Sequence, residues 1–140
     1  QYGLNVASEY STDFSGYVKA MKKGISKLKA YFPNTSIVIM GVGDRSRKGE
    51  GAYETMRSIP LLIKAQRKIA AETGIAFFDL FTAMGGENSM LTFVNHKPAW
   101  ANKDYTHLNH AGGKHIAHIL AGSILFEHKK HQQKKAYETQ

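Results

Sequence analysis

Two short, mostly apolar runs constrain the fold of this chain more than any other feature. Residues 36–42 (SIVIMGV) and 75–81 (IAFFDLF) lack the alternation of a half-exposed strand, and such continuous runs are typical of parallel strands covered on both faces. Residues 59–73 between them have helical spacing, with Pro60 in the first turn and Gly74 after the last. This order predicts neighbouring parallel strands joined by a right-handed crossover, in an α/β fold.

One helix is expected before this unit in the sequence and another after it. Apolar residues recur at helical spacing from Phe14 to Leu28. A second helix is expected from His110 or Ala111 to about Glu127, with Asn109 as its N-cap. We expect its buried stripe to comprise Ile116, Ile119, Leu120 and Ile124. Residues 43–51 and 82–103 have no sustained period and are expected to be loops.

Two strands make a poor parallel sheet, because such a sheet needs neighbours at its edges and layers on both faces. We therefore expect residues 1–127 to be the carboxyl-terminal part of a larger α/β domain whose first strands lie outside this sequence, which begins at Gln1 without a methionine. Residues 128–140 are expected to form a basic polar tail. An exposed apolar edge is expected near Val38 and Ile39, covered by another chain or a packing partner.

Charge and composition narrow the choice of partners. The 140 residues include 19 Lys and Arg against 11 Asp and Glu, a formal charge of +8, which makes anionic surfaces plausible partners. The lysines gather in the first helix and the tail, where solvated faces are the favoured interpretation. Nucleic-acid binding is not expected, since no interleaved aromatics or known module accompany the charge. The apolar runs are far too short to span a membrane.

A carboxylate and a histidine stand at the end of the second loop, in Asp104-Tyr105-Thr106-His107. In a turn at a helix start, Asp104 can reach Nδ1 of His107 and leave Nε2 outward as a base. The same four residues could equally form a helix cap with an incidental histidine. At the other end of the chain, Gly3 and Asn5 in Tyr2-Gly3-Leu4-Asn5 could supply a backbone N–H and a side-chain NH₂ to an oxyanion.

Together and in this order, the two ends resemble the SGNH (GDSL-like) hydrolases, whose third block is G-x-N(-D) and whose fifth is D-x-x-H before the final helix. Residues 100–113 (WANKDYTHLNHAGG) resemble the branch that acts on acetylated carbohydrate. Residues 83–90 (AMGGENSM) look like a loop of peptidoglycan O-acetylesterase relatives. The resemblance covers essentially all of the chain.

The resemblance implies a partial flavodoxin-like, three-layer α/β/α fold and a serine esterase that removes O-acetyl groups from a carbohydrate or another small ester. It places the catalytic base at His107, the acid at Asp104, and the oxyanion donors at Gly3 and Asn5. It requires no metal or diffusible cofactor. It also implies a periplasmic or secreted protein.

The sequence departs from the family pattern at the nucleophile. The G-D-S block with the serine and the second-block glycine belong upstream of Gly3, where neither is present, so we expect the chain alone to be inactive. Ser46 follows Gly43-Asp44-Arg45 and is interpreted as an ordinary loop residue, and Ser8 and Ser89 lack a strand-to-helix elbow. Asn5 is followed by Val6 instead of aspartate.

Several other residues have competing interpretations. Trp100 could stack on a sugar in a non-catalytic carbohydrate-binding module, or be buried in the loop. A metal site among His107, His110, His115 and His118 is disfavoured, because helical spacing turns His115 and His118 toward solvent. Asp44 and Asp79 follow the two strands, where ligands bind open α/β sheets, but capping or turn formation is favoured for both.

Overall fold

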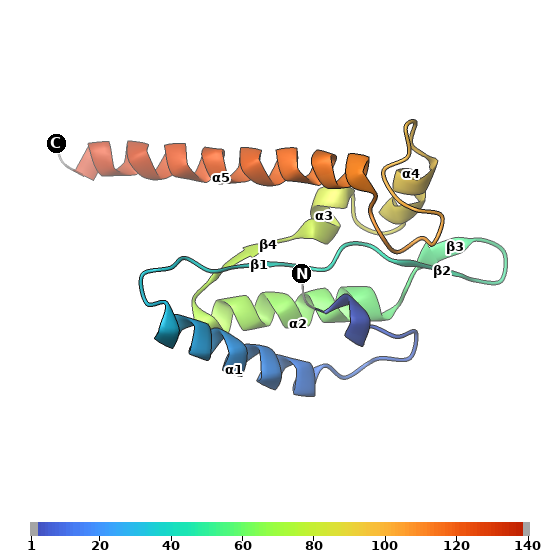
Figure 1. The fold of residues 1–140 in the computed structure, drawn as a ribbon, viewed down its shortest axis with the longest axis horizontal. Coiled ribbons are helices and arrows are strands. Elements are labelled where there is room, and N and C mark those ends of the chain that lie inside the picture. The colour runs from blue at the N-terminus through green and yellow to red at the C-terminus, as the bar shows by residue number, and fades with distance from the viewer. Residues whose placement is uncertain (1–2, 139–140) are drawn as a thin grey trace.

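The computed structural model describes residues 3–138. Its elements alternate between helices and short strands (Figure 1). In chain order they are the 3-10 helix η1 (Leu4–Val6), α1 (Ser15–Tyr31), β1 (Val38–Met40), β2 (Ser46–Lys48), β3 (Tyr53–Thr55), α2 (Ser58–Thr73), β4 (Ala76–Phe78), α3 (Leu80–Met84), α4 (Ser89–Asn95) and α5 (His110–Glu138).

The two apolar runs form neighbouring parallel strands, as predicted. Strand β1 pairs with β4 in the register Val38↔Ala76, Ile39↔Phe77 and Met40↔Phe78. Helix α2 makes the crossover between them. The strands are shorter than the apolar runs, with three residues each. The α/β class with parallel strands is thereby confirmed.

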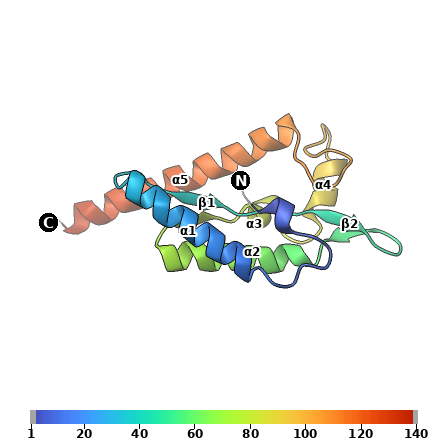
Figure 2. The same ribbon diagram turned by 60° about the horizontal axis from the view of Figure 1, so that its bottom comes forward.

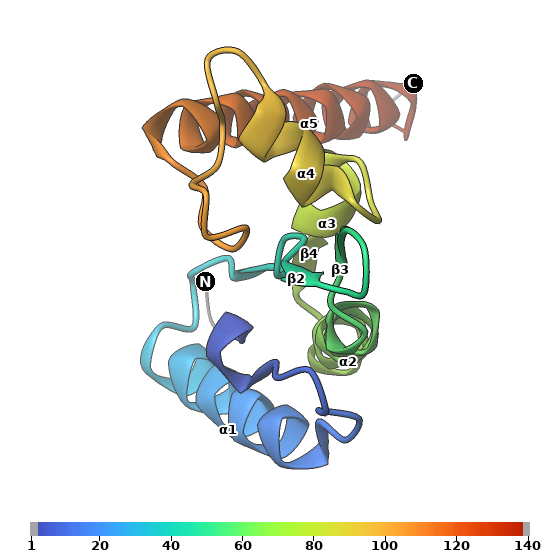
Figure 3. The ribbon, with the colours of Figure 1, turned by 90° about the vertical axis from the view of Figure 1, so that its right-hand side faces the viewer.

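Helices cover the strand pair on two sides (Figures 1 and 3). Helices α1 and α2 lie on one side of the strands, whereas α3, α4 and α5 lie on the other. The first side is filled by a buried cluster of Ile25, Ile39, Ile69 and Ala70. The second side is filled by a cluster that comprises Leu80, Met84, Met90, Phe93, Ala101 and Ile116. Each apolar run therefore contributes to a two-sided core, which is why it lacks polar alternation.

Helix α2 joins the sheet to α1 through one buried amide. Gln66 is fully buried; its Oε1 accepts a hydrogen bond from the backbone N–H of Val42 at 2.9 Å, and its Nε2 donates to the hydroxyl of Tyr17 at 3.0 Å. The helix ends at Gly74, whose φ of 61° and ψ of 44° lie in the left-handed region that glycine adopts without steric cost.

The two expected loops contain regular structure, so those predictions are wrong. Residues 43–51 contribute β2, which pairs antiparallel with β3 from Ser46↔Thr55 to Lys48↔Tyr53. Residues 82–103 contain α4 and most of α3. All of these elements are short, three to seven residues, and a helical period does not show in so few positions.

The last helix also differs from the expectation. Helix α5 continues to Glu138, past the predicted end near Glu127, because residues 123–138 contain neither Gly nor Pro and are rich in helix-forming Lys, Gln, Ala and Glu. Ile116 is buried, but Ile124 is 59 % exposed, so the predicted stripe ends before it. This end of the helix projects beyond the other elements (Figure 2). The assignment of residues 1–127 and 128–140 to a domain and a tail stays a prediction.

The edge of the parallel pair is partly exposed. Val38 is 54 % exposed, as expected, whereas Ile39 is buried under α1 and α2. Which partner covers this edge stays a prediction. None of the helices within residues 3–138 combines the length and the apolar character that crossing a bilayer requires.

Candidate active site

Asp104 and His107 form a hydrogen-bonded pair. Nδ1 of His107 lies 2.8 Å from Oδ2 of Asp104. The other carboxylate oxygen, Oδ1, accepts the backbone N–H groups of Thr106 at 2.9 Å and His107 at 3.0 Å. The turn therefore brings the two side chains together as the D-x-x-H spacing predicts. Both are accessible, since the side chain of His107 is 65 % exposed and that of Asp104 is 48 % exposed.

These hydrogen bonds keep Asp104 ionised. They lower its pKa from 3.8 to about 2, chiefly through the backbone N–H of His107 and then through its ring. Because an ionised carboxylate only accepts hydrogen bonds, Nδ1 carries the proton and the lone pair of a neutral His107 lies on Nε2. This is the tautomer that a general base of the Ser-His-Asp type uses.

A short backbone ladder supports the pair. Ala101 and Leu108 form an antiparallel bridge, and the backbone N–H of Asn102 donates to the carbonyl of His107 at 2.9 Å. Tyr105 occupies the tip with a positive φ of 55°. We call the Asp104–His107 pair the dyad, and residues 101–108, which carry it, the dyad loop.

The start of α5 closes the dyad loop. Asn109 caps the helix, as predicted: its Oδ1 accepts the N–H of Gly112 at 3.0 Å, and its Nδ2 donates to the carbonyl of Ala99 at 2.7 Å. Gly112 has no room for a side chain, because a Cβ there would lie 1.9 Å from the carbonyl oxygen of Trp100. The first turn of α5 therefore packs directly on the backbone at the base of the loop.

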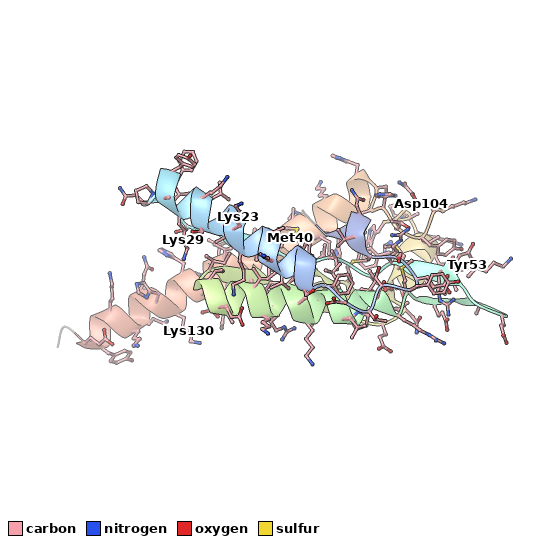
Figure 4. The ribbon with its side chains drawn as sticks, turned by 90° about the horizontal axis from the view of Figure 1, so that it is seen from below. Lys23, Lys29, Met40, Tyr53, Asp104 and Lys130 are labelled. Atoms are coloured by element: carbon pink, nitrogen blue, oxygen red, sulfur yellow. The ribbon has the colours of Figure 1, made fainter. Side chains whose placement is uncertain are left out.

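The β2–β3 hairpin packs on the tip of the dyad loop. The rings of Tyr53 and Tyr105 stack with centroids 3.6 Å apart, and the N–H of Ser46 donates to the carbonyl of Tyr105 at 2.9 Å. Tyr53 and Asp104 lie at the same end of the molecule, and Lys130 lies at the other end (Figure 4).

A cavity of about 210 Å³ adjoins His107. Thr106, His107 and Leu108 line one side, and Leu4, Gly43, Asp44, Leu80, Met84 and Met90 line the rest. The N-terminal segment thus reaches the cavity through Leu4, between the two predicted oxyanion residues. The hairpin holds this segment: Arg45 donates to the carbonyl of Ala7 at 3.2 Å, and Arg47 pairs with Glu9.

The fold constrains the residue type at Gly3 more strongly than at Asn5. Gly3 has a φ of 130°, and a Cβ there would lie 2.8 Å from Nε2 of Gln66, so the position requires glycine. Asn5 is exposed in η1, and within residues 3–138 no hydrogen bond joins it to Asp104 or His107. Tyr2, the first residue of that motif, lies outside the described residues. The oxyanion role of Gly3 and Asn5 stays a prediction.

The two aspartates after the strands have structural roles. Asp79 caps α3 by accepting the N–H of Thr82 at 3.0 Å and pairs with Arg67. Asp44 is 1 % exposed; it accepts the hydroxyl of Thr55 at 2.8 Å and the N–H of Met90 at 2.8 Å. Burial raises the pKa of Asp44. Capping is confirmed for Asp79, and Asp44 holds the first turn of α4 from a distant position.

Trp100 and His115 lie in an aromatic stack, where both are half-buried. His96 covers one face of the Trp100 indole and His115 covers the other. The predicted exposure of His115 is therefore wrong, whereas His118 is exposed as predicted. Because both faces of Trp100 are covered, its ring does not offer a platform for a sugar. No three His, Asp or Glu side chains converge on a possible metal position anywhere in residues 3–138.

The serines considered from the sequence do not provide a nucleophile elbow. Ser46 is a buried residue of β2, Ser8 is exposed between η1 and α1, and Ser89 begins α4. None of these three stands between a strand and the helix that follows it.

Comparison with known proteins shows the fold. A solved structure described as "Peptidoglycan O-acetylesterase in action, 5 min" superposes on 91 % of this chain with a TM-score of 0.81 and 23 % sequence identity. This chain spans 36 % of the length of that one. No family model and no curated protein matches the sequence. The chain thus has an α/β fold with a parallel strand pair, in agreement with part of a flavodoxin-like domain.

Proposed function

We propose that this chain carries the acid–base half of an SGNH-type serine ester hydrolase that removes O-acetyl groups from a carbohydrate such as peptidoglycan. The observation that carries the proposal is the 2.8 Å hydrogen bond between Nδ1 of His107 and Asp104, beside a cavity that the N-terminal segment also lines. The fold it shares with a peptidoglycan O-acetylesterase structure agrees with this function.

In the proposed mechanism, a serine from sequence upstream of Gln1 attacks the acetyl carbonyl while Nε2 of His107 takes the serine proton. The tetrahedral oxyanion is stabilised by the N–H of Gly3 and the NH₂ of Asn5. Its collapse breaks the ester bond, and His107 returns the proton to the sugar oxygen that leaves. Water then attacks the acetyl-serine, gives a proton to His107, and releases acetate as the serine regains its proton.

Asp104 acts through His107 in both half-reactions. It fixes the tautomer with the proton on Nδ1, and its negative charge stabilises the imidazolium that forms at each proton transfer. Exposure of the His107 side chain suits a substrate too large to be enclosed. An O-acetylated wall polymer would be met in the periplasm or outside the cell, where we propose that the protein acts.

The alternative, a non-catalytic carbohydrate- or cell-wall-binding module, would hold a glycan through Trp100 and the polar cluster of the same loops. The imidazoles that cover both indole faces remove its aromatic platform. We therefore propose only the esterase.

The test is hydrolysis of p-nitrophenyl acetate and acetate release from O-acetylated peptidoglycan by the protein with its upstream sequence. We expect activity in the parent, its loss in His107→Ala, and retention in His118→Ala, which changes an exposed histidine of α5. An inactive parent with an intact upstream G-D-S serine would refute the esterase.

A further inference from the structure

Three stacked rings lie at the base of the dyad loop. The Trp100 ring is stacked with His96 at a centroid distance of 3.5 Å and an interplanar angle of 19°. On its other face it is stacked with His115 at 4.0 Å and 14°. Phe93, which is buried, makes edge-to-face contacts with Trp100 at 5.2 Å and with His115 at 5.9 Å. We call His96, Trp100 and His115 the ring stack.

The ring stack joins three separate segments. His96 directly follows α4, Trp100 precedes the dyad loop, and His115 lies in the second turn of α5. His96 is fixed in its plane, because its Nδ1 lies 2.8 Å from the carbonyl oxygen of Pro98, which can only accept. The backbone N–H of Trp100 donates to the carbonyl of Phe93 at 2.8 Å. The stack therefore clamps the loop base between α4 and α5.

A continuous ladder leads from the ring stack to the dyad. The carbonyl of Trp100 accepts the N–H of Asn109 at 3.0 Å. The next step is the bridge between Ala101 and Leu108, and the one after it is the bond from Asn102 to the carbonyl of His107 at 2.9 Å. A shift of Trp100 out of its plane would move this ladder and with it the backbone of His107.

We propose that the ring stack is a positioning device for His107, so that His96, Trp100 and His115 set the geometry of the Asp104–His107 pair without touching the substrate. Its catalytic consequence rests on the proposed esterase function, but its geometric consequence does not. The two imidazoles matter because they cover both indole faces and so oppose movement of the ring out of its plane.

Trp100 is the single tryptophan of the 140 residues, so its fluorescence reports on the stack alone. In His115→Ala one indole face opens, and we expect acrylamide to quench Trp100 more strongly than in the parent. His115→Phe keeps a flat ring and should restore the parent's protection. His118→Ala, on the same helix, is the matched control, and acrylamide should quench its Trp100 fluorescence as much as in the parent.

The second readout is the NMR signal of the Nδ1 proton of His107, whose low-field position reports its hydrogen bond to Asp104. We expect this signal to weaken or shift toward free imidazole in His115→Ala and to return in His115→Phe. In the protein with its upstream sequence, kcat should fall about 2- to 10-fold in His115→Ala, the scale of one lost aromatic pair. KM should be unchanged, because the stack does not bind substrate.

An unchanged His107 proton signal in His115→Ala with an opened Trp100 face would show that the stack is only structural and would overturn the proposal. So would unchanged quenching, since the stack would then not exist in solution. If His115→Ala does not fold, His96→Ala opens the opposite face from outside any helix and gives the same comparison. Because both spectroscopic readouts need no substrate, an inactive parent would refute the esterase and leave this test intact.

Discussion

Three hydrogen-bond donors of two kinds converge on the carboxylate of Asp104. Two are backbone N–H groups, those of Thr106 and His107, and the third is Nδ1 of the His107 ring. The backbone donors fix the carboxylate even when the ring moves. The D-x-x-H pair could be predicted from the sequence because every one of these bonds spans at most three residues.

The proposed roles of three residues predict an order of activity losses in the protein with its upstream sequence. His107→Ala should abolish nearly all esterase activity, because His107 moves the proton in both half-reactions of the proposed mechanism. Asp104→Asn should lose less, up to about 10⁴-fold, through the wrong tautomer. Asn5→Ala should lose about 10²–10³-fold, since the N–H of Gly3 remains.

The measurement is kcat/KM on one acetyl ester, with thermal unfolding of each variant compared with the parent so that misfolding is not mistaken for lost chemistry. If His107→Ala hydrolyses the ester as fast as the parent, His107 is not the base.

The lowered pKa of Asp104 predicts a contribution to stability that depends on pH. Because the folded pKa, about 2, lies below the unfolded value of 3.8, the contribution is present above pH about 4 and is lost as the pH falls toward 2. The free energy of unfolding in urea should therefore decline less between pH 5 and about 2 in Asp104→Asn than in the parent. Parallel declines would show that the hydrogen bonds of Asp104 do not stabilise the fold.

The short elements around the site depend on distant partners, which explains why the sequence did not reveal them. The first turn of α4 is held by Asp44, which is 46 positions before Met90 in sequence, and the β2–β3 hairpin packs on Tyr105. The ring stack likewise draws on three segments. The crossover of β1, α2 and β4 was predictable, because the two continuous apolar runs and the helical spacing between them are visible in the sequence itself.

The first turn of α5 provides a sharp test of close packing. Gly112→Ala places a Cβ 1.9 Å from the carbonyl oxygen of Trp100, so the helix must shift, at a cost of about 1–3 kcal/mol in the free energy of unfolding. Gly113→Ala is the matched control: a Cβ there meets nothing within 4 Å, and alanine should stabilise the helix by up to about 1 kcal/mol.

Urea unfolding of the two variants measures this difference. Equal stabilities for Gly112→Ala and Gly113→Ala would mean that α5 does not begin against Trp100.

At the scale of the whole molecule, the outer edge of β1 is incompletely covered. Within residues 3–138, β1 pairs only with β4, and Val38 on β1 is 54 % exposed. An exposed edge with an apolar side chain favours pairing with another chain. The sequence located this edge because the apolar run 36–42 predicts a strand with only one predicted neighbour.

We expect the 140-residue chain to associate as its concentration rises, and Val38→Lys to weaken that association, because charge on an edge strand opposes pairing. Leu61→Lys replaces a comparably exposed aliphatic residue on α2, 43 % exposed, and should associate like the parent. Sedimentation velocity distinguishes these outcomes. A parent that stays monomeric at every concentration would show that the edge of β1 does not mediate self-association.

The dyad is built within four consecutive residues, and this locality has a consequence for fragment complementation. Since Asp104 and His107 are already aligned in this chain, the proposed function implies that a separate polypeptide with the upstream strands and serine would only have to dock beside them to complete an enzyme from two pieces. Mixing the two should produce acetylesterase activity that saturates with the concentration of the second piece. The same titration with His107→Ala should stay at the background rate, because the piece that docks brings no base of its own.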